Sequence, residues 1–516
     1  MSLKRLVAIC VSVIISVVLL TLCAGQSSAA GAAQGGGGQV LRMAFYAPGT
    51  LDPHFGSTQA DDNVSRLMYD YFVFFDEDYK LELGRGLAES YNVDESGTVW
   101  TFAVRQGVTF HNGKKLTSKD VKFSFDRLRD PNIGSPIAGT LSNITDISTP
   151  DDYTVVFTLK APNPDFLYDL FAYQAKVVDA DNENFNTNWN GTGPFIVDNY
   201  IPEDRIVLSR NPNYWLHDDK GTQLPYLGGV EYLFLADESS QLEALRSGQV
   251  QFLMFLPAEF VPELKANPDI DVYSIASNFS YVLRMRSDEG RPAADNRVRK
   301  ALKLGTDREA MLIGAAGGLG VTGRDTPIGP AFGAYYLDVP EPERDVKRAK
   351  ELLAEAGYPN GLDITLHTQR DSPVPAMATI WQQQMADIGV NVNIQLVPTE
   401  IYYGDMWMNV DFGFTDWGPR PYPQPYLDLA YVTGGDWNES KYSNPKLDEL
   451  AAQAGKEIDQ QKRTELYHQI QKIFMEEGPI IVPFFLDNLY ATRSNIGGVK
   501  PSFGMSLDLR LFYFKN

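Results

Sequence analysis

Cysteine is nearly absent from this chain. Its 516 residues include two cysteines, Cys10 and Cys23, and both lie close to the N-terminus. The rest of the chain therefore has neither a disulfide nor a thiol nucleophile. The five histidines, between His54 and His468, are too far apart in sequence for a local metal motif such as H-E-x-x-H, and the chain contains no G-x-S-x-G elbow and no Walker A loop. These absences argue against an enzyme, although a secreted hydrolase that uses paired carboxylates needs no such motif.

Positive charge is also in short supply. The chain carries 45 lysines and arginines against 66 aspartates and glutamates, which gives a formal net charge of -21. An acidic surface repels phosphate groups, so we expect no nucleic-acid partner. Hydrophobic residues make up 44% and charged residues 22% of the chain, which is a globular composition. Because 516 residues exceed what one hydrophobic core organises, we predict two or more lobes.

What the sequence does contain begins with an export signal. Two basic residues, Lys4 and Arg5, precede an apolar run over 6–22, and the small residues 28–30 (SAA) have the character of a cleavage site. We predict that residues 1–30 are a signal peptide. An uncleaved membrane anchor is the alternative, because the apolar run approaches the length that spans a bilayer.

A glycine-rich stretch over 31–39 follows, and we interpret it as a flexible tether to the folded domain. Cys23 raises the alternative of a lipid anchor. Leu22 stands directly before it, where the lipid-attachment motif of bacterial lipoproteins usually has a small residue. The sequence therefore favours an exported protein without a lipid.

Two patterns of secondary structure divide the folded part of the chain. Alternating apolar residues over 99–104 indicate a strand in a β-rich first part. From Arg297 onward helices and strands alternate: 362–366 is an alternating strand, 374–388 is helical and 390–396 is a strand again. A strand, a helix and a strand with short joins predict a βαβ unit with parallel pairing.

Residues 318–323 (GLGVTG) match the G-x-G-x-x-G pattern of dinucleotide-binding loops. That interpretation requires a strand before the glycines and a helix after them. Here a helical pattern precedes the glycines, and 324–327 (RDTP) follow as a loop. We therefore predict a connecting loop and no cofactor.

The segment 412–431 (FGFTDWGPRPYPQPYLDLAY) has the most unusual composition. Four prolines stiffen the path from Pro419 to Pro425, which predicts neither a helix nor a central strand for this segment. Trp417 and Arg420 combine an aromatic face with a charged group. Two interpretations stay open: a rigid surface loop, or a cleft wall whose shape is fixed before a small ligand arrives.

Several long motifs also occur in a fixed order along the chain. They are 84–90 (GRGLAES), 98–102 (TVWTF), 105–113 (RQGVTFHNG), 116–121 (LTSKDV), 191–195 (GTGPF), 210–215 (RNPNYW), 297–302 (RVRKAL) with 307–308 (DR), and 356–361 (AGYPNG). Together they resemble solute-binding protein family 5, the peptide, oligopeptide and nickel receptors of ATP-driven (ABC) importers. The resemblance covers the chain from about residue 40 to its end.

This resemblance implies an α/β fold of the periplasmic-binding-protein type, in which two lobes joined by a hinge close over a ligand. Lobe one would comprise 40–285, completed by 488–516, with an extra β-rich subdomain at about 85–190. Lobe two would comprise 286–487.

The resemblance also implies a function without chemistry. The protein would be exported to the periplasm or the outer face of the cytoplasmic membrane, and would act there as a monomer. It would capture a small solute, peptide or peptide-like by family, and deliver it to an ABC permease and its ATPase subunits. No cofactor or metal is implied, and contact with the membrane would come only through the tether or the permease.

Site residues follow from the same resemblance. Two segments would line the ligand. One is the loop after the first Asp-Pro, and the other is a strand-to-loop segment in which the peptide receptors of this family hold a tryptophan. In this chain they supply Phe55, Ser57, Thr58, Gln59, Asp416, Trp417, Gly418 and Arg420. In peptide receptors an aspartate at the position of Arg420 pairs with the peptide's ammonium group. Because an arginine cannot bind an ammonium group, a receptor for an anionic or sugar-like solute is the alternative to a peptide receptor.

Overall fold

The computed structural model describes residues 38–516 apart from 371–372, 503, 505–506 and 516. The predicted signal peptide, residues 1–30, lies outside the described residues, as does most of the predicted tether. Within the part of the chain that is described, no helix is long and apolar enough to cross a membrane.

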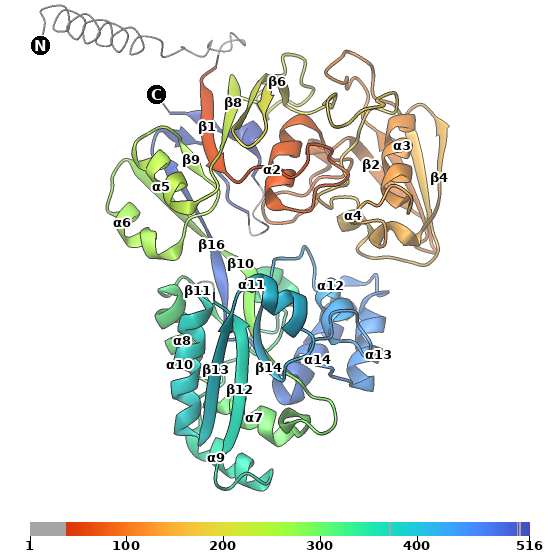
Figure 1. Ribbon diagram of the computed structural model, residues 1–516. Coiled ribbons are helices and arrows are strands. Elements are labelled where there is room, and N and C mark those ends of the chain that lie inside the picture. The colour runs from red at the N-terminus through yellow and green to blue at the C-terminus, as the bar shows by residue number, and fades with distance from the viewer. Residues whose placement is uncertain (1–37, 371–372, 503, 505–506, 516) are drawn as a thin grey trace, which may run out of the picture.

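The chain folds into two lobes, which Figure 1 shows one above the other. Two long antiparallel strands, β10 (Ile270–Met285) and β16 (Phe484–Arg493), run from one lobe into the other. They are the middle of a twelve-stranded sheet that continues into both lobes. The predicted two-lobed α/β architecture is confirmed.

Lobe two extends the sheet on one side of β10. β14 (Phe412–Trp417) pairs antiparallel with β10, and β12 (Leu362–Gln369) and β13 (Val390–Val397) follow outward in parallel pairing. Helix α10 (Val374–Asp387) connects β12 to β13, so the predicted parallel βαβ unit is confirmed.

Helices cover both faces of the lobe-two sheet. The first face packs against α10 and against α7 (Asn296–Gly305), α8 (Arg308–Ala316) and α9 (Val346–Glu355). The second face packs against α12 (Gln424–Tyr426), α13 (Pro445–Ala454) and α14 (Gln460–Glu477). Side chains alternate along β10, so Leu283 lies in the core of the first face and Val282 in the core of the second.

Lobe one extends the sheet on the other side of β16. Its strands are, in order outward, β9 (Phe252–Leu253), β1 (Val40–Phe45), β8 (Gly229–Phe234), β7 (Arg205–Arg210) and β6 (Phe195–Ile201). Its helices include α2 (Gln59–Met68), α5 (Glu238–Arg246) and α6 (Val261–Lys265). The C-terminal strands β17 (Ile496–Gly497) and β18 (Tyr513–Phe514) return to this lobe.

A separate four-stranded antiparallel sheet forms the side of lobe one. Its strands are β2 (Ala88–Val93), β3 (Val99–Val104), β5 (Thr154–Leu159) and β4 (Ile144–Asp151), and it carries α3 (Ser118–Arg129) and α4 (Phe166–Asp169). In β3 every second residue is buried, as its alternation predicted. Helix α4 lies at the end of this unit that faces lobe two (Figure 1).

Two local predictions need correction. The segment 412–431, for which neither a helix nor a central strand was predicted, begins as a central strand, β14, because Phe412 and Phe414 fill the lobe-two core before the prolines are reached. It ends in helical turns over Gln424–Tyr426 and Leu427–Tyr431. The G-x-G-x-x-G segment is partly a strand, β11 (Gly320–Thr322), which pairs with β16. Because β11 follows α8 and leads into a loop, the structure still lacks the strand-then-helix context of a nucleotide site.

Candidate ligand-binding site

A cavity of about 530 Å³, here called the distal cavity, lies between the lobes at the side of α4. Lobe one and the C-terminal segment contribute Ser57, Arg66, Tyr79, Pro136, Ile137, Thr140, 168–169, 171–174 and Gly504. Lobe two contributes 419–422, Pro425, Leu429 and Trp437. Its volume suits a small molecule, and its walls consist mostly of aromatic and aliphatic side chains with few charged groups, which is the usual composition of such sites.

Arg420 is the arginine of this cavity whose guanidinium group has no ion-pair partner among the described residues. Its backbone N–H donates to the hydroxyl of Tyr426 at 3.0 Å, and that hydroxyl donates to the carbonyl of Gly418 at 2.8 Å. These two bonds fix the turn that presents the side chain. The Nε of Arg420 is buried and makes no hydrogen bond, and no described carboxylate forms an ion pair with the guanidinium group.

The second arginine of the cavity, Arg66, already has an ion-pair partner. The guanidinium group of Arg66 donates to Asp62 at 2.6 Å, and Lys176 donates to the same carboxylate at 2.7 Å. Burial alone raises the pKa of Asp62, but the charges of Arg66 and Lys176 outweigh it and lower that pKa to about 2. Asp62 therefore stays ionised and holds Arg66 in place, which leaves Arg420 as the cavity arginine without an ion-pair partner among the described residues.

The predicted residues of the Asp-Pro loop occupy different positions. Ser57 lines the distal cavity together with Arg420. Thr58 caps α2, where its hydroxyl accepts from the N–H of Asp61, and Gln59 donates to the hydroxyl of Tyr173 at 2.5 Å. Phe55 is 36% exposed and lies 5.3 Å from the guanidinium carbon of Arg127. Only Ser57 of these four lines the cavity in this structure.

The predicted residues at the end of β14 lie behind the cavity wall. Trp417 is 4% exposed, and its ring packs 5.9 Å from that of Trp437, which does line the cavity. Asp416 accepts hydrogen bonds from Tyr403 and from Gln369. Trp417 therefore supports the aromatic wall, and the exposed aromatic face belongs to Trp437.

Glu439 holds that wall together and was not found from the sequence. Its carboxylate is fully buried and accepts from the hydroxyl of Thr415 at 2.7 Å and from the indole nitrogens of Trp407 and Trp417. Arg284, also fully buried, lies 3.5 Å from it. The sequence gives no local signal for this network, because Glu439 stands in an ordinary polar stretch.

Contacts between the lobes at α4 were also not predicted. The hydroxyl of Tyr422 donates to Asp169 at 3.0 Å, and the ring of Tyr422 stacks on that of Tyr168 at 5.3 Å. Burial raises the pKa of Asp169 to about 7, which the hydrogen bonds from Tyr422 and Asn163 only partly offset. Near neutral pH this cavity-lining carboxyl group is therefore partly protonated.

A second cavity of about 430 Å³, here called the hinge cavity, lies against the strands that join the lobes. Lobe one contributes Glu238 and 255–259, the joining strands contribute Phe279, Tyr281 and 486–489, and lobe two contributes Ala315, Ala316, Leu319 and Pro373. Apolar side chains form most of its surface, and its charged groups are carboxylates.

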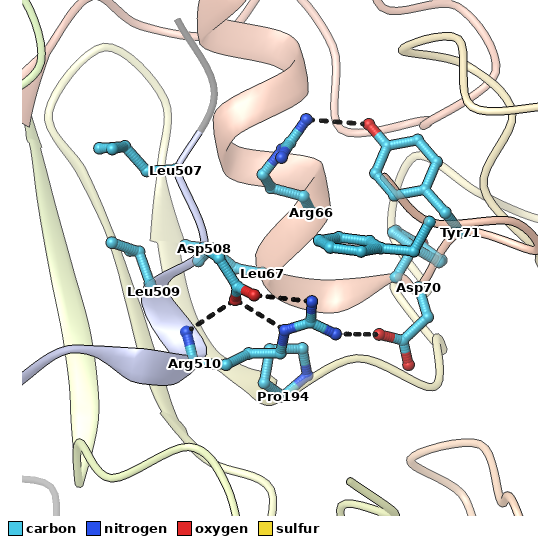
Figure 2. A pocket seen from close by; sticks show the side chains of 11 residues that line it. Arg66, Leu67, Asp70, Tyr71, Pro194, Leu507, Asp508, Leu509 and Arg510 are labelled. Atoms are coloured by element: carbon cyan, nitrogen blue, oxygen red, sulfur yellow. Dashed lines mark hydrogen bonds and ion pairs between the residues drawn. The ribbon is translucent and has the colours of Figure 1, made fainter. Parts of the chain in front are cut away.

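A third, much smaller cavity lies inside lobe one and is shown in Figure 2. Arg510 pairs there with Asp508 at 2.6 Å and lies 3.9 Å from Asp70. The free volume is about 30 Å³, which is room for about one water molecule. This ion network ties the C-terminal segment to the residues that follow α2 and is too tight for a solute. Among the described residues no group of three or more His, Cys, Asp or Glu side chains is arranged to hold a metal.

Two lobes joined by paired strands, with cavities between them, define the class of extracytoplasmic solute-binding proteins. The chain belongs to the bacterial extracellular solute-binding proteins of family 5, whose "family 5 Middle" profile matches residues 82–440. It is therefore a solute-binding protein of an ABC importer, as its motifs predicted.

Curated relatives and solved structures agree with this assignment. The glutathione-binding protein GsiB of Escherichia coli K12 is 27% identical over 480 residues, which cover 89% of this chain and 91% of the relative. HbpA2 of Haemophilus parasuis has a TM-score of 0.83 at 24% identity, and the match covers 93% of this chain and 100% of that one. DppA of Helicobacter pylori, solved with the peptide STSA, has a TM-score of 0.73 at 25% identity over 93% and 98% of the two chains.

Proposed function

We propose that this receptor captures a small, peptide-like solute between its lobes and binds a carboxylate of that solute through Arg420. The observation that carries the proposal is the buried Nε of Arg420, which has no hydrogen-bond partner in a cavity lined by both lobes. A buried donor without a partner costs about 1–3 kcal/mol, and an incoming carboxylate removes that cost. A sugar-like solute with paired hydroxyls is the second candidate, because a guanidinium group also fits two such acceptors.

The relatives support a peptide-like solute that carries negative charge. GsiB is named for glutathione, and DppA was solved with a peptide. Glutathione is a small peptide with two carboxylates, so a cation at the position of Arg420 suits a solute of that type. The aromatic rings of Tyr173, Tyr422 and Trp437 add apolar contact around the anchor.

Binding would work through closure of the lobes. A solute that contacts both lobes favours the closed form over the open one, and its binding energy is the only source of that shift. The hinge would lie near residues 286 and 488, where β10 and β16 pass between the lobes, and the predicted division into 40–285 with 488–516 and 286–487 follows from it. The closed receptor, a monomer, would dock on the permease, whose ATPase subunits drive uptake.

Two further parts of the proposal concern location and chemistry. The basic residues, apolar run and small residues of 1–30 support export and cleavage near Ala30. N-terminal sequencing of exported protein tests this, and an intact Met1 recovered from the cytosol contradicts it.

The receptor itself would carry out no chemistry, so the co-purified solute should be recovered unchanged after prolonged incubation.

Native mass spectrometry of the purified protein is the deciding experiment. Solutes buried between lobes survive gentle purification, so we expect a mass excess that corresponds to one small molecule with a carboxylate. Small-angle scattering of the released and reloaded protein should show compaction on loading, and the melting temperature should rise, because the solute binds only the folded state. A tightly bound solute that leaves the radius of gyration unchanged would contradict closure.

A further inference from the structure

The hinge cavity has the opposite electrostatic character to the distal cavity. Three carboxylates lie around it: Glu238 and Glu259 from lobe one, and Asp487 from β16. Among the described residues that line it, none is lysine, arginine or histidine. None of the three carboxylates forms an ion pair with a described cation. Uncompensated negative charge therefore gathers in one cavity and an uncompensated guanidinium group in the other.

The carboxylates of the hinge cavity repel one another. Glu238 accepts a hydrogen bond from the hydroxyl of Tyr46 at 3.4 Å. Its pKa is raised, first by burial and also by the charge of Glu259. Asp487 accepts a hydrogen bond from the hydroxyl of Ser274 at 2.5 Å. A cation placed among these groups would reduce the repulsion between their negative charges.

The walls of the hinge cavity suit the body of such a cation. Phe255 is 37% exposed in the cavity, and the rings of Phe279 and Tyr281 meet edge to face with centroids 5.5 Å apart. Aromatic faces attract cations, and the attraction grows where water is excluded. A volume of about 430 Å³ exceeds what a bare ammonium ion fills, so an apolar group must accompany the charge.

The two cavities lie on opposite faces of the joining strands, beside an edge of β10 that no described strand covers. Tyr281 packs against the core of the first face of the lobe-two sheet, whereas Leu429, which lines the distal cavity, packs against the core of the second face. β14 ends at Trp417, opposite Ser280, and among the described strands none continues along that edge of β10. A solute long enough to pass this edge would reach both faces.

We propose that the hinge cavity receives a cationic group on an apolar body, such as an arylalkyl ammonium or guanidinium, carried by the transported solute. This inference rests on the proposed function, in which Arg420 binds the anionic group of the same molecule. The solute is then dipolar, and its orientation is set by the two cavities.

Three small probes of equal size test the charge preference: phenethylammonium, 2-phenylethanol and phenylacetate. Ligand-observed NMR with the full mature protein, stripped of its solute, should rank the cation at least fivefold tighter than the alcohol and the alcohol above the anion. In a Glu238→Gln/Glu259→Gln double variant the cation should lose at least fivefold in affinity while the alcohol binds as before. Glu449→Gln, an exposed glutamate of lobe two, is the matched control and should change neither.

Competition completes the experiment. The solute released from the native receptor should displace phenethylammonium, since both need the hinge cavity. The inference is overturned if the cation binds no tighter than the alcohol, if the double variant binds it like the parent, or if the solute does not displace it. If the receptor closes on a co-purified solute but fails these tests, the proposed function stands and only this inference is wrong. If the receptor closes on no solute, the proposed function is wrong, whatever the probes show.

Discussion

Arg463 and Asp165 join the two lobes at a point far from the hinge. The guanidinium group of Arg463, on α14 of lobe two, donates through both terminal nitrogens to the two carboxylate oxygens of Asp165, next to α4 of lobe one, with Nη1 to Oδ1 at 2.7 Å. Both side chains are 4% exposed. The lobes are therefore in contact at α4 as well as through β10 and β16, and α4 also carries Tyr168 and Asp169, which line the distal cavity.

Removal of this ion pair should loosen the lobes. Arg463→Ala leaves the carboxylate of Asp165 buried without a counter-charge, and breaking a buried pair in this way costs about 3–5 kcal/mol. We expect a lower melting temperature and, in small-angle scattering of the solute-free protein, a larger radius of gyration. Lys446→Ala, which breaks an exposed pair with Glu449, is the control and should change neither quantity measurably. An unchanged radius for Arg463→Ala would show that the pair does not hold the lobes.

Asp169 should make stability depend on pH. Its pKa in the folded protein is about 7, well above the ordinary value of 3.8. Between about pH 4 and 7 the folded chain therefore keeps a proton that the unfolded chain has lost, so stability falls as the pH rises through this window. The full effect is present below about pH 4, is lost above about pH 7, and amounts to at most about 4 kcal/mol.

The matching variant is Asp169→Asn, which keeps the size and one hydrogen-bond acceptor but cannot ionise. Its melting temperature should fall less between pH 4.5 and 7.5 than that of the parent protein. Asp146→Asn, at an exposed position of β4, should follow the parent curve. Identical pH profiles for Asp169→Asn and the parent would refute the raised pKa.

Glu439 should prove necessary for the aromatic wall. Glu439→Ala removes the acceptor shared by Trp407, Thr415 and Trp417, and leaves Arg284 buried beside an empty space. A loss of about 3–5 kcal/mol in the free energy of unfolding is expected from the unpaired buried charge. Tryptophan fluorescence should shift to longer wavelength as water reaches the indoles. Unaltered fluorescence would mean that the wall holds without this carboxylate.

The sequence predicted those parts of the fold in which pattern and core coincide. In strands such as β3 and β12, apolar and polar side chains alternate because every second side chain faces a core. This two-residue period can be recognised in the sequence alone. The prediction failed for β14, because the prolines after Trp417 dominated the interpretation of a segment whose first residues are core.

The candidate site was only partly accessible from the sequence. Ser57 and Arg420 were predicted from motif positions, and both line the distal cavity. Asp165 and Arg463 are 298 positions apart, and Tyr422 and Asp169 are 253 apart, so their contacts exist only once both lobes are folded and brought together. Trp437 was missed because its role depends on lying in front of Trp417, which no local spacing reveals.

Arg420 offers the sharpest test of the proposed solute chemistry. A buried charge-assisted hydrogen bond lost from a binding site costs about 2–5 kcal/mol, whereas loss of an exposed arginine pair leaves affinity nearly unchanged. Arg420→Ala should therefore weaken the native solute at least about tenfold, which corresponds to about 1.4 kcal/mol. Arg420→Lys should recover part of this loss, since an ammonium group keeps the charge but not the paired donors.

Arg348→Ala, on the exposed surface of α9, is the matched control and should bind the solute like the parent. Because Arg420 forms no ion pair with any described residue and its buried Nε has no hydrogen-bond partner among them, its replacement should not lower the melting temperature of the solute-free protein, which separates a binding defect from a folding defect. Titration calorimetry with the solute identified by native mass spectrometry decides the matter: equal affinities for Arg420→Ala and the parent would remove Arg420 from the site, and tight binding of simple peptides through a free amine would overturn the assignment of a carboxylate to this position.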